Sequence, residues 1–199
     1  MVRAMSETPW DQKIARILVR PLANSRIRPN HVTVATAMLA VLGAVLIALQ
    51  FYIWGAGLFV LSRFLDHFDG ELARLQHTTS KLGYYLDYAS GGTSYSALFI
   101  GLGIGFWHDL GWWSIALAAA GATSSLISLI SNMVIDRKVK DVEKGEAIGY
   151  PGFAGFELED GIYLLAPVTW LGFLEPFFIA AGIGAGIYTL CTISRAIRL

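Results

Sequence analysis

Long apolar segments joined by short connections are the feature that most constrains how this chain can fold. A helix needs roughly 20 mainly apolar residues to cross a bilayer. Segments of about this length can be placed at 32–50, 56–75, 83–106, 112–135, 157–173 and 176–196. With 55% hydrophobic and only 15% charged residues, the chain is also too apolar for one water-soluble core. The sequence therefore predicts an all-α integral membrane protein with six transmembrane helices.

The basic residues lie on one side of these predicted spans. The connections near 51–55, 107–111 and 174–175 contain no Lys or Arg, whereas both ends of the chain and the other connections are rich in them. Cytoplasmic loops carry such an excess, so we expect a multi-pass protein of the cell inner membrane with both termini in the cytoplasm. Amphipathic indole rings favour the headgroup region, and the opposite boundary contains Trp54, Trp107, Trp112, Trp113 and Trp170.

A separate amphipathic segment precedes the first span, at residues 10–22. Its apolar helical face contains Trp10, Ile14, Ile17 and Leu18. This pattern predicts a helix that lies in the inner-leaflet interface; the alternative is a cytoplasmic helix packed on the protein. We therefore divide the chain into a cytoplasmic interfacial segment, residues 1–31, and a six-helix transmembrane domain, residues 32–199. The formal net charge of zero gives no indication of a nucleic-acid partner.

Three acidic residues lie where charges are costly. Asp66 and Asp69 are three residues apart on the second predicted span, so their side chains leave one helix face in the cytoplasmic half of the bilayer. Asp87 enters the third span from the same side. Carboxylates at this depth indicate a functional site, and three of them suit a hard divalent cation, Mg²⁺ or Mn²⁺, shared with substrate phosphates. The alternative is that the acids pair with Arg63 and Arg74 and bridge the helices.

The spacing around these acids is specific. Residues 66–74 read DHFDGELAR, and after eight further residues 83–87 read GYYLD. This order resembles the motif of the CDP-alcohol phosphotransferase family, DxxDGxxAR followed by eight residues and GxxxDxxxD. The six predicted spans extend the resemblance over nearly the whole chain. The resemblance implies a membrane transferase whose active site faces the cytoplasm.

The resemblance also implies a role for each motif residue. Asp66, Asp69 and Asp87 would bind the metal, and Arg74 would stabilise the motif or neutralise pyrophosphate charge. Small side chains let a ligand approach the backbone. Those that would leave room for the cytidine nucleotide are Gly70, Ala73 and Gly83. Together these residues would hold the CDP-alcohol.

The implied reaction transfers a substituted phosphate group from a CDP-alcohol to a small polar alcohol acceptor, with release of CMP, in phospholipid synthesis. We expect CDP-diacylglycerol as the donor. The metal would neutralise the charge that develops on the pyrophosphate while the acceptor hydroxyl attacks the other phosphorus. A general base must take the hydroxyl proton. In the family this role is assigned to the fourth aspartate of the motif, which also faces a second metal.

The chain departs from the motif at that fourth aspartate, because the residue is Gly91. Two explanations stay open: a substitution that silenced the enzyme, or a natural relative that lost or rerouted its base. The departure makes a catalytically impaired, nucleotide-binding member of the family an alternative to an active enzyme. A divalent-cation transporter is a third interpretation, since intramembrane carboxylates also line ion pathways.

Further charged residues are candidates for contact with the acceptor. Glu157 and Asp160 stand at the start of the fifth predicted span. They would either contact a cationic or hydroxyl-rich acceptor or only stabilise the positive end of a helix. Arg137 and Arg195 could instead bind a phosphorylated acceptor, although basic residues there also follow the positive-inside rule.

Glycine pairs at GxxxG spacing occur at Gly101 and Gly105 and again at Gly182 and Gly186. Such pairs let membrane helices approach one another closely. Each pair would serve either a homodimer contact or packing within one subunit. Membrane lipid is expected to surround the remaining apolar surface.

Overall fold

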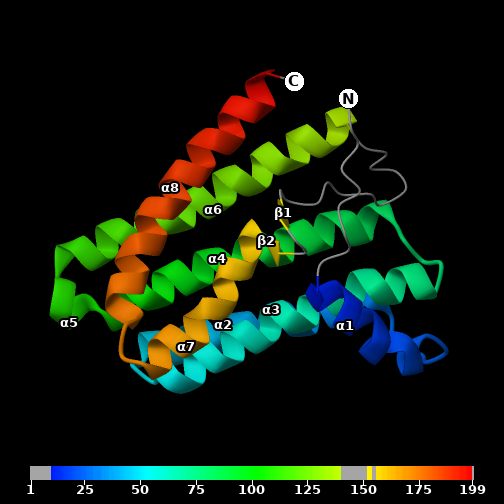
Figure 1. Ribbon diagram of the computed structural model, residues 1–199, viewed down its shortest axis with the longest axis horizontal. Helices are drawn as coiled ribbons and strands as arrows, with labels where there is room; N and C mark the ends of the chain where they lie inside the picture. Colours follow the sequence, from blue (N-terminus) through cyan, green and yellow to red (C-terminus); the bar gives the residue numbers. More distant parts are fainter. Residues whose placement is uncertain (1–9, 140–151, 154–155, 199) are drawn as a thin grey trace.

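Helices form almost all of the computed structural model, which describes residues 10–139, 152–153 and 156–198 (Figure 1). In chain order the helices are α1 (Trp10–Val19), η1 (Arg20–Leu22), α2 (Pro29–Ala48), α3 (Tyr52–Leu75), α4 (Lys81–Gly105), α5 (Trp107–Leu110), α6 (Trp112–Val139), η3 (Leu158–Leu164), α7 (Leu165–Trp170) and α8 (Leu174–Arg198). Two short strands, β1 (Gly152–Phe153) and β2 (Phe156–Glu157), form one antiparallel pair. The helical fold class is confirmed apart from this pair.

Local sequence signals explain where the long helices begin and end. α2 begins at Pro29, whose fixed φ suits the first turn of a helix. The Ser80 hydroxyl caps α4 by accepting a hydrogen bond from the Gly83 N–H at 3.1 Å. The turns before α6 and α8 need positive φ, which Gly111 (54°) and Gly172 (82°) supply. Five of the six predicted spans therefore coincide with long helices.

The fifth predicted span differs from the prediction. Residues 157–173 form the end of β2, the 3-10 helix η3, the six-residue helix α7 and a turn, and not one long helix. Pro167 is the reason for the late start of α7, because proline is tolerated only in the first turn of an α-helix. At about 2.0 and 1.5 Å rise per residue, η3 and α7 together span roughly 23 Å, less than the ~30 Å of a bilayer core.

Among the described residues, three helices are long and apolar enough to cross a membrane: α2, the Trp112–Arg137 part of α6 and the Leu174–Ser194 part of α8. α3 and α4 are as long, with 24 and 25 residues, but carry the polar residues of the candidate site. Large apolar side chains are exposed on the outer helix faces; Met38 is 68% exposed and Leu190 is 70% exposed. Such surfaces indicate a membrane protein. The count of six spans stays a prediction.

Successive long helices run in opposite directions, so alternate connections lie at opposite ends of the bundle (Figure 1). The three connections without Lys or Arg share one end with the exposed Trp54, Trp112 and Trp170, and we call it the tryptophan end. The other end contains the starts of α2 and α4 and the ends of α3, α6 and α8, and we call it the basic end. The charge asymmetry of the sequence is thus an asymmetry between the two ends of the fold.

α2 lies between α3 and α4, while α6 packs on α4, α8 packs on α6, and both α7 and α1 pack on α3. Small residues permit the close contacts of α2. A Cβ added at Gly55 of α3 would lie only 2.7 Å from the Gly43 carbonyl oxygen of α2. Gly101 and Gly105 of α4 likewise face backbone carbonyl groups of α2, so this GxxxG pair packs within one subunit. No described atom lies within 4 Å of a Cβ added at Gly186.

α1 forms as predicted and packs on α3. Its inner face buries Asp11, Ala15 and Val19, whereas Ile17 and Leu18 stay more than half exposed. The helix therefore packs on the protein and still presents apolar side chains outward. Its position in the inner-leaflet interface stays a prediction.

Candidate functional site

The three acids singled out in the sequence lie together at the basic end. One carboxylate oxygen from each of Asp66, Asp69 and Asp87 lies within 4.8 Å of the other two. Asp66 and Asp69 come from α3, and Asp87 comes from α4. Because α2 separates these two helices, their side chains meet across α2.

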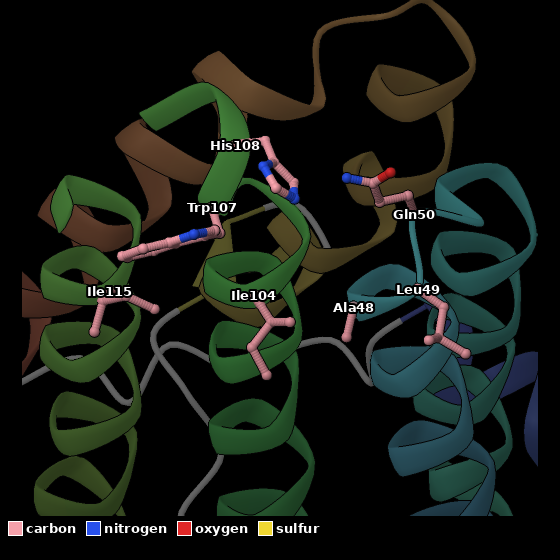
Figure 2. Close-up of a pocket in the computed structure, with 7 residues that line it drawn as sticks. All are labelled: Ala48, Leu49, Gln50, Ile104, Trp107, His108 and Ile115. Carbon is pink, nitrogen blue, oxygen red and sulfur yellow. The ribbon is translucent and has the colours of Figure 1, made fainter. Parts of the chain in front are cut away.

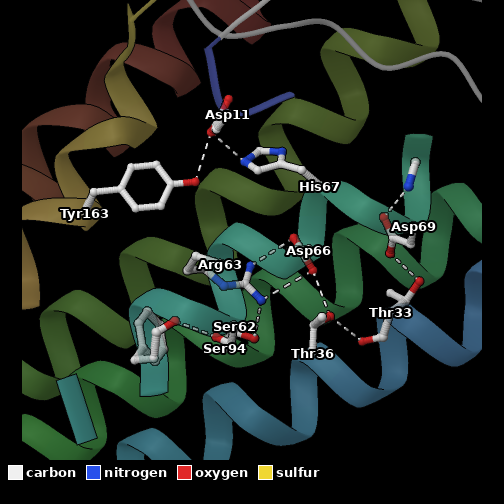
Figure 3. A network of polar contacts seen from close by, with 12 residues as sticks. Asp11, Thr33, Thr36, Ser62, Arg63, Asp66, His67, Asp69, Ser94 and Tyr163 are labelled. Carbon is white, nitrogen blue, oxygen red and sulfur yellow. Dashed lines mark hydrogen bonds and ion pairs between the residues drawn. The ribbon is translucent and has the colours of Figure 1, made fainter. Parts of the chain in front are cut away.

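Two threonines of α2 hold the carboxylates of α3 (Figure 3). The Thr33 hydroxyl donates to Asp69 Oδ2, and the Thr36 hydroxyl donates to Asp66 Oδ1 at 3.2 Å. The threonines are three residues apart, as the two aspartates are, so the two pairs match in register. Thr33 and Thr36 were not among the predicted site residues, and their shared spacing is the only sequence signal for this role.

Arg63 is buried beside the cluster, with 6% of the residue exposed. Its Nη1 donates to Asp66 Oδ2 at 3.1 Å, and its Nη2 donates to Asp66 Oδ1 at 3.4 Å and to Ser94 Oγ at 3.2 Å. The guanidinium carbon also lies 5.8 Å from the centre of the Tyr95 ring. Asp66 therefore pairs with Arg63, as the alternative interpretation of the sequence predicted for the acids.

The other motif residues lie at the same end. Arg74 pairs with Glu71 at 2.7 Å and not with the three aspartates. A Cβ added at Gly70 would lie 3.6 Å from the Arg74 guanidinium, so Gly70 leaves space beside it. Ala73 is half-buried in the last turns of α3, and Gly83 lies in the first turn of α4. Their part in nucleotide binding stays a prediction.

Gly91 lies on α4 one helical turn after Asp87. No described atom lies within 4 Å of a Cβ added there. Packing therefore does not require glycine at this position. The missing carboxylate changes the chemistry of the site without relieving a steric conflict.

A buried acid outside the three-aspartate cluster links α4 to α6. Asp136 is 1% exposed and accepts hydrogen bonds from the Tyr84 hydroxyl at 3.0 Å and the Tyr88 hydroxyl at 2.6 Å. These tyrosines bracket Asp87, so they set how α4 presents it. Sequence reasoning did not identify this cluster.

α1 is linked to the site region through His67 (Figure 3). His67 Nε2 lies 2.8 Å from Asp11 Oδ2, and the Tyr163 hydroxyl donates to the same oxygen at 2.9 Å. Burial raises the pKa of Asp11, but its hydrogen bonds with His67 and Tyr163 and the charge of His67 outweigh burial and lower that pKa. His67 thus packs between α3 and α1.

The acceptor candidates are only partly placed. Arg137 lies on the exposed side of α6, where its guanidinium donates to the Tyr85 hydroxyl at 3.1 Å. The backbones of Glu157, Asp160 and Arg195 belong to β2, η3 and α8. Their side chains lie outside the part of the structure that is described, so their role stays a prediction.

A pocket of about 600 Å³ lies at the tryptophan end (Figure 2), whereas the three aspartates lie at the basic end. Its lining includes Gln50, Ile104, Trp107 and His108. It contains no carboxylate among its lining residues. This pocket is therefore not the site that the motif predicts.

The three carboxylates fit a divalent cation. Oxygen ligands bind Ca²⁺ at about 2.3–2.6 Å, so two oxygens on one such ion lie up to about 5 Å apart. The three oxygens lie within 4.8 Å of one another, close enough for side-chain rotations to bring them onto one ion. Mg²⁺, with bonds of about 2.1 Å, requires a closer approach of the oxygens than Ca²⁺ does.

Residues 26–194 match the protein family described as CDP-alcohol phosphatidyltransferase. The chain belongs to this family. Among curated relatives, it is 32% identical to a phosphatidylinositol phosphate synthase of Corynebacterium glutamicum over 147 residues, which covers 70% of this chain and 62% of the relative. It is 42% identical to a bifunctional IPC transferase and DIPP synthase of Thermococcus kodakarensis over 69 residues, covering 35% of this chain and 16% of the relative. The chain thus spans less than two thirds of these two relatives.

This CDP-alcohol phosphatidyltransferase family member also shares its fold with solved structures. Mycobacterium tuberculosis phosphatidylinositol phosphate synthase with CDP-DAG bound superposes with a TM-score of 0.58 at 21% identity, over 94% of this chain and 91% of that one. The same enzyme with manganese and citrate gives a TM-score of 0.55 at 22% identity, over 92% and 86% of the chains. These structures show a shared fold, and the match over residues 26–194 confirms the family that the motif resembles.

Proposed function

We propose that this protein transfers the substituted phosphate group of CDP-diacylglycerol to the hydroxyl of a small polar alcohol, with release of CMP, in phospholipid synthesis. The observation that carries the proposal is the convergence of Asp66, Asp69 and Asp87 within 4.8 Å at one end of the family fold. A protein of the same fold binds CDP-DAG, which supports this class of donor.

The three aspartates would hold Mg²⁺ or Mn²⁺, an assignment supported by the structural relative that contains manganese. When bound, a divalent ion neutralises charge on the pyrophosphate. The acceptor oxygen forms a bond to the phosphorus that carries the alcohol group. The bond from that phosphorus to the bridging oxygen breaks, CMP leaves with the electron pair, and the hydroxyl proton passes to a base.

The chain's own residues would position this reaction. Thr33 and Thr36 fix the rotamers of Asp69 and Asp66, so the carboxylates are oriented before substrate arrives. Gly70, Ala73 and Gly83 would leave space for the nucleotide along the backbone, and Arg74 would lie near its phosphates.

A second candidate function is nucleotide binding with little or no turnover. The observation that favours it is Gly91, which leaves α4 without a carboxylate one turn after Asp87. Losing a positioned general base costs roughly 10²–10⁴-fold in rate, while donor binding to the remaining three acids would persist.

The acceptor site is proposed at the basic end. Glu157 and Asp160 would suit a cationic or hydroxyl-rich acceptor, whereas Arg137 and Arg195 would suit a phosphorylated one. An acceptor carrying a phosphate should compete with inorganic phosphate, and this competition separates the two possibilities.

The proposed setting is the cell inner membrane, with both termini and the active site on the cytoplasmic side. Residues 1–31 would form the interfacial segment, and residues 32–199 would form the transmembrane domain. A homodimer is proposed as well, with a contact at Gly186 of α8, where no described atom lies within 4 Å of an added Cβ.

The decisive experiment is mass spectrometry of lipid products after incubation of the purified protein with CDP-diacylglycerol, Mg²⁺ and a panel of alcohols. Asp66→Asn should abolish transfer, and Asp109→Asn, an exposed acid at the tryptophan end, should not. Stabilisation by CDP-diacylglycerol without CMP release would instead identify the impaired, nucleotide-binding member. Metal flux across vesicles without a CDP-alcohol would contradict both and identify a transporter.

A further inference from the structure

Asp87 belongs to a different helix from the other two candidate metal ligands. Asp66 and Asp69 lie on α3, whereas Asp87 lies in the second turn of α4. The distance from the Asp87 carboxylate to those of α3 therefore depends on how α4 is rotated about its own axis. Helix ends fray, so this early part of α4 needs support if it is to present a ligand in one fixed direction.

A small rotation of α4 is enough to remove Asp87 from the site. The side chains of a helix reach about 5–6 Å from its axis, so a rotation of about 20° moves a carboxylate by about 2 Å. A Mg²⁺–oxygen bond is only about 2.1 Å long, and the ion requires near-ideal geometry. Whatever fixes the rotation of α4 near Asp87 therefore decides whether this carboxylate reaches an ion bound to Asp66 and Asp69.

Two tyrosines of α4 meet one oxygen of α6 at this point. The hydroxyls of Tyr84 and Tyr88 donate to Asp136 Oδ2 at 3.0 and 2.6 Å. The two tyrosines are one turn apart on one face of α4, and their ring centres lie 4.8 Å apart. We call Tyr84, Tyr88 and Asp136 the tyrosine clamp. Because two stiff side chains from successive turns converge on one atom, rotation or sliding of α4 would lengthen at least one of these bonds.

Burial makes the tyrosine clamp hard to open. Asp136 is 1% exposed and Tyr84 is 5% exposed. A buried carboxylate that loses a hydrogen-bond donor cannot replace it with bulk water, so each bond is costly to break. Further along α4, Gly92 lies directly against Leu129 of α6. Apolar packing therefore sets the distance between α4 and α6, and directed hydrogen bonds fix α4 at the end that carries Asp87.

The tyrosine clamp and the metal ligand occupy different sides of the same two turns. Asp87 precedes Tyr88 by one residue and follows Tyr84 by three. At about 100° per residue, Asp87 lies about 60° around the helix from Tyr84. The tyrosines thus face α6, while the Asp87 carboxylate turns toward those of Asp66 and Asp69. The backbone of α4 transmits the constraint from one side to the other.

We propose that the tyrosine clamp positions Asp87 for metal binding, so that Tyr84, Tyr88 and Asp136 are positioning residues that set the affinity of the site for a divalent ion. The proposal rests on the proposed function, because it assumes that the three aspartates bind a metal. It makes α6 part of the metal site, although the three ligands come from α3 and α4.

The test is Mn²⁺ binding to the purified full chain, measured by equilibrium titration. Tyr88→Phe removes the shorter hydrogen bond and keeps both the ring and the charge of Asp136, and we expect it to weaken Mn²⁺ binding by about tenfold. Tyr85→Phe is the matched control, because the Tyr85 hydroxyl accepts an exposed hydrogen bond from Arg137 and should leave the affinity unchanged. Equal affinities for Tyr88→Phe and the unsubstituted chain would overturn the proposal.

Water on the bound ion separates positioning from general damage to the fold. The proton relaxation of water at saturating Mn²⁺ reports how many waters the ion binds, and a carboxylate that no longer reaches the ion is replaced by water. Tyr88→Phe should therefore gain water on the ion, as Asp87→Asn does, and an unchanged count would overturn the proposal. Added to Asp87→Asn, Tyr88→Phe should weaken binding no further. An equal loss in that background would show that the tyrosine clamp does not act through Asp87.

A second variant and the unsubstituted chain complete the test. Tyr84→Phe removes the longer hydrogen bond and should act in the same direction, so it replaces Tyr88→Phe if that variant fails to fold. Binding that depends on Asp66 but on neither tyrosine hydroxyl would overturn this proposal alone. No Mn²⁺ binding by the unsubstituted chain, or binding that Asp66→Asn leaves unchanged, would overturn the proposed function and this proposal with it.

Discussion

Gly91→Asp should raise the rate of CMP release at least about tenfold. The position accepts a side chain, because no described atom lies within 4 Å of a Cβ added there. Aspartate is also a slightly better helix residue than glycine, by a few tenths of a kcal/mol, which offsets part of its repulsion from Asp87 one turn away. A positioned general base contributes roughly 10²–10⁴-fold. We expect the lower part of this range, because Arg63, bonded to Ser94 nearby, would stabilise the new carboxylate and make it a weaker base.

The assay measures CMP release at saturating CDP-diacylglycerol and acceptor, for the unsubstituted chain, Gly91→Asp and Gly91→Asn. Asparagine has nearly the same shape as aspartate but cannot take the proton, so its rate should match that of the unsubstituted chain. Equal rates for the aspartate and asparagine variants would show that a base at this position does not limit turnover. The proton acceptor would then have to be sought elsewhere, first at Glu157 and Asp160.

Three other substitutions test the site and its support. Thr33→Val removes the hydrogen bond to Asp69 and should weaken Mn²⁺ binding by about 10–100-fold, whereas Thr33→Ser should retain it in the same titration. Gly101→Leu should force α4 away from α2 and lower the free energy of unfolding by about 1–3 kcal/mol. Gly186→Leu is the control, because the added side chain would enter open space and should leave this free energy unchanged. Thermal unfolding measures both effects. Asp11→Asn should cost about 1–2 kcal/mol at neutral pH. Because folding lowers the pKa of Asp11, its stabilisation is present above the unfolded-state value of 3.8 and is lost as pH falls through the lower folded value. If Asp11→Asn lowers stability by the same amount in acid as at neutral pH, the lost stability does not come from the ionised Asp11 carboxylate.

The convergence of the three acids could be predicted from the sequence because local rules determine it. Helical periodicity places Asp66 and Asp69 on one face, and the short connection before α4 returns Asp87 to the same level. The positions of the long helices followed from apolar length. The fifth span could not be predicted in this way, since the apolar character of residues 157–173 does not distinguish a 3-10 helix from an α-helix.

The partners of the acids could not be predicted, because they depend on how the helices are rotated about their axes. In the sequence, Thr33 and Thr36 are ordinary residues near the start of an apolar span. Their hydrogen bonds to Asp69 and Asp66 follow only from the position of α2 between α3 and α4. Arg63 was visible as a basic residue in the middle of a predicted span, 56–75. Its bond to Ser94, which connects it with the Gly91 departure, appears only in three dimensions.

Close packing far from the acids determines the geometry of the site. α2 lies between α3 and α4, so the distance between Asp66 and Asp87 depends on how closely both helices approach α2. Those approaches are fixed by glycine contacts nearer the tryptophan end, such as Gly43 against Gly55. Gly43 lies seven residues, or about 10 Å, along α2 from Thr36. Helices are stiff over such a distance, so contacts in the apolar half of the bundle hold the carboxylates of the polar half within reach of one ion.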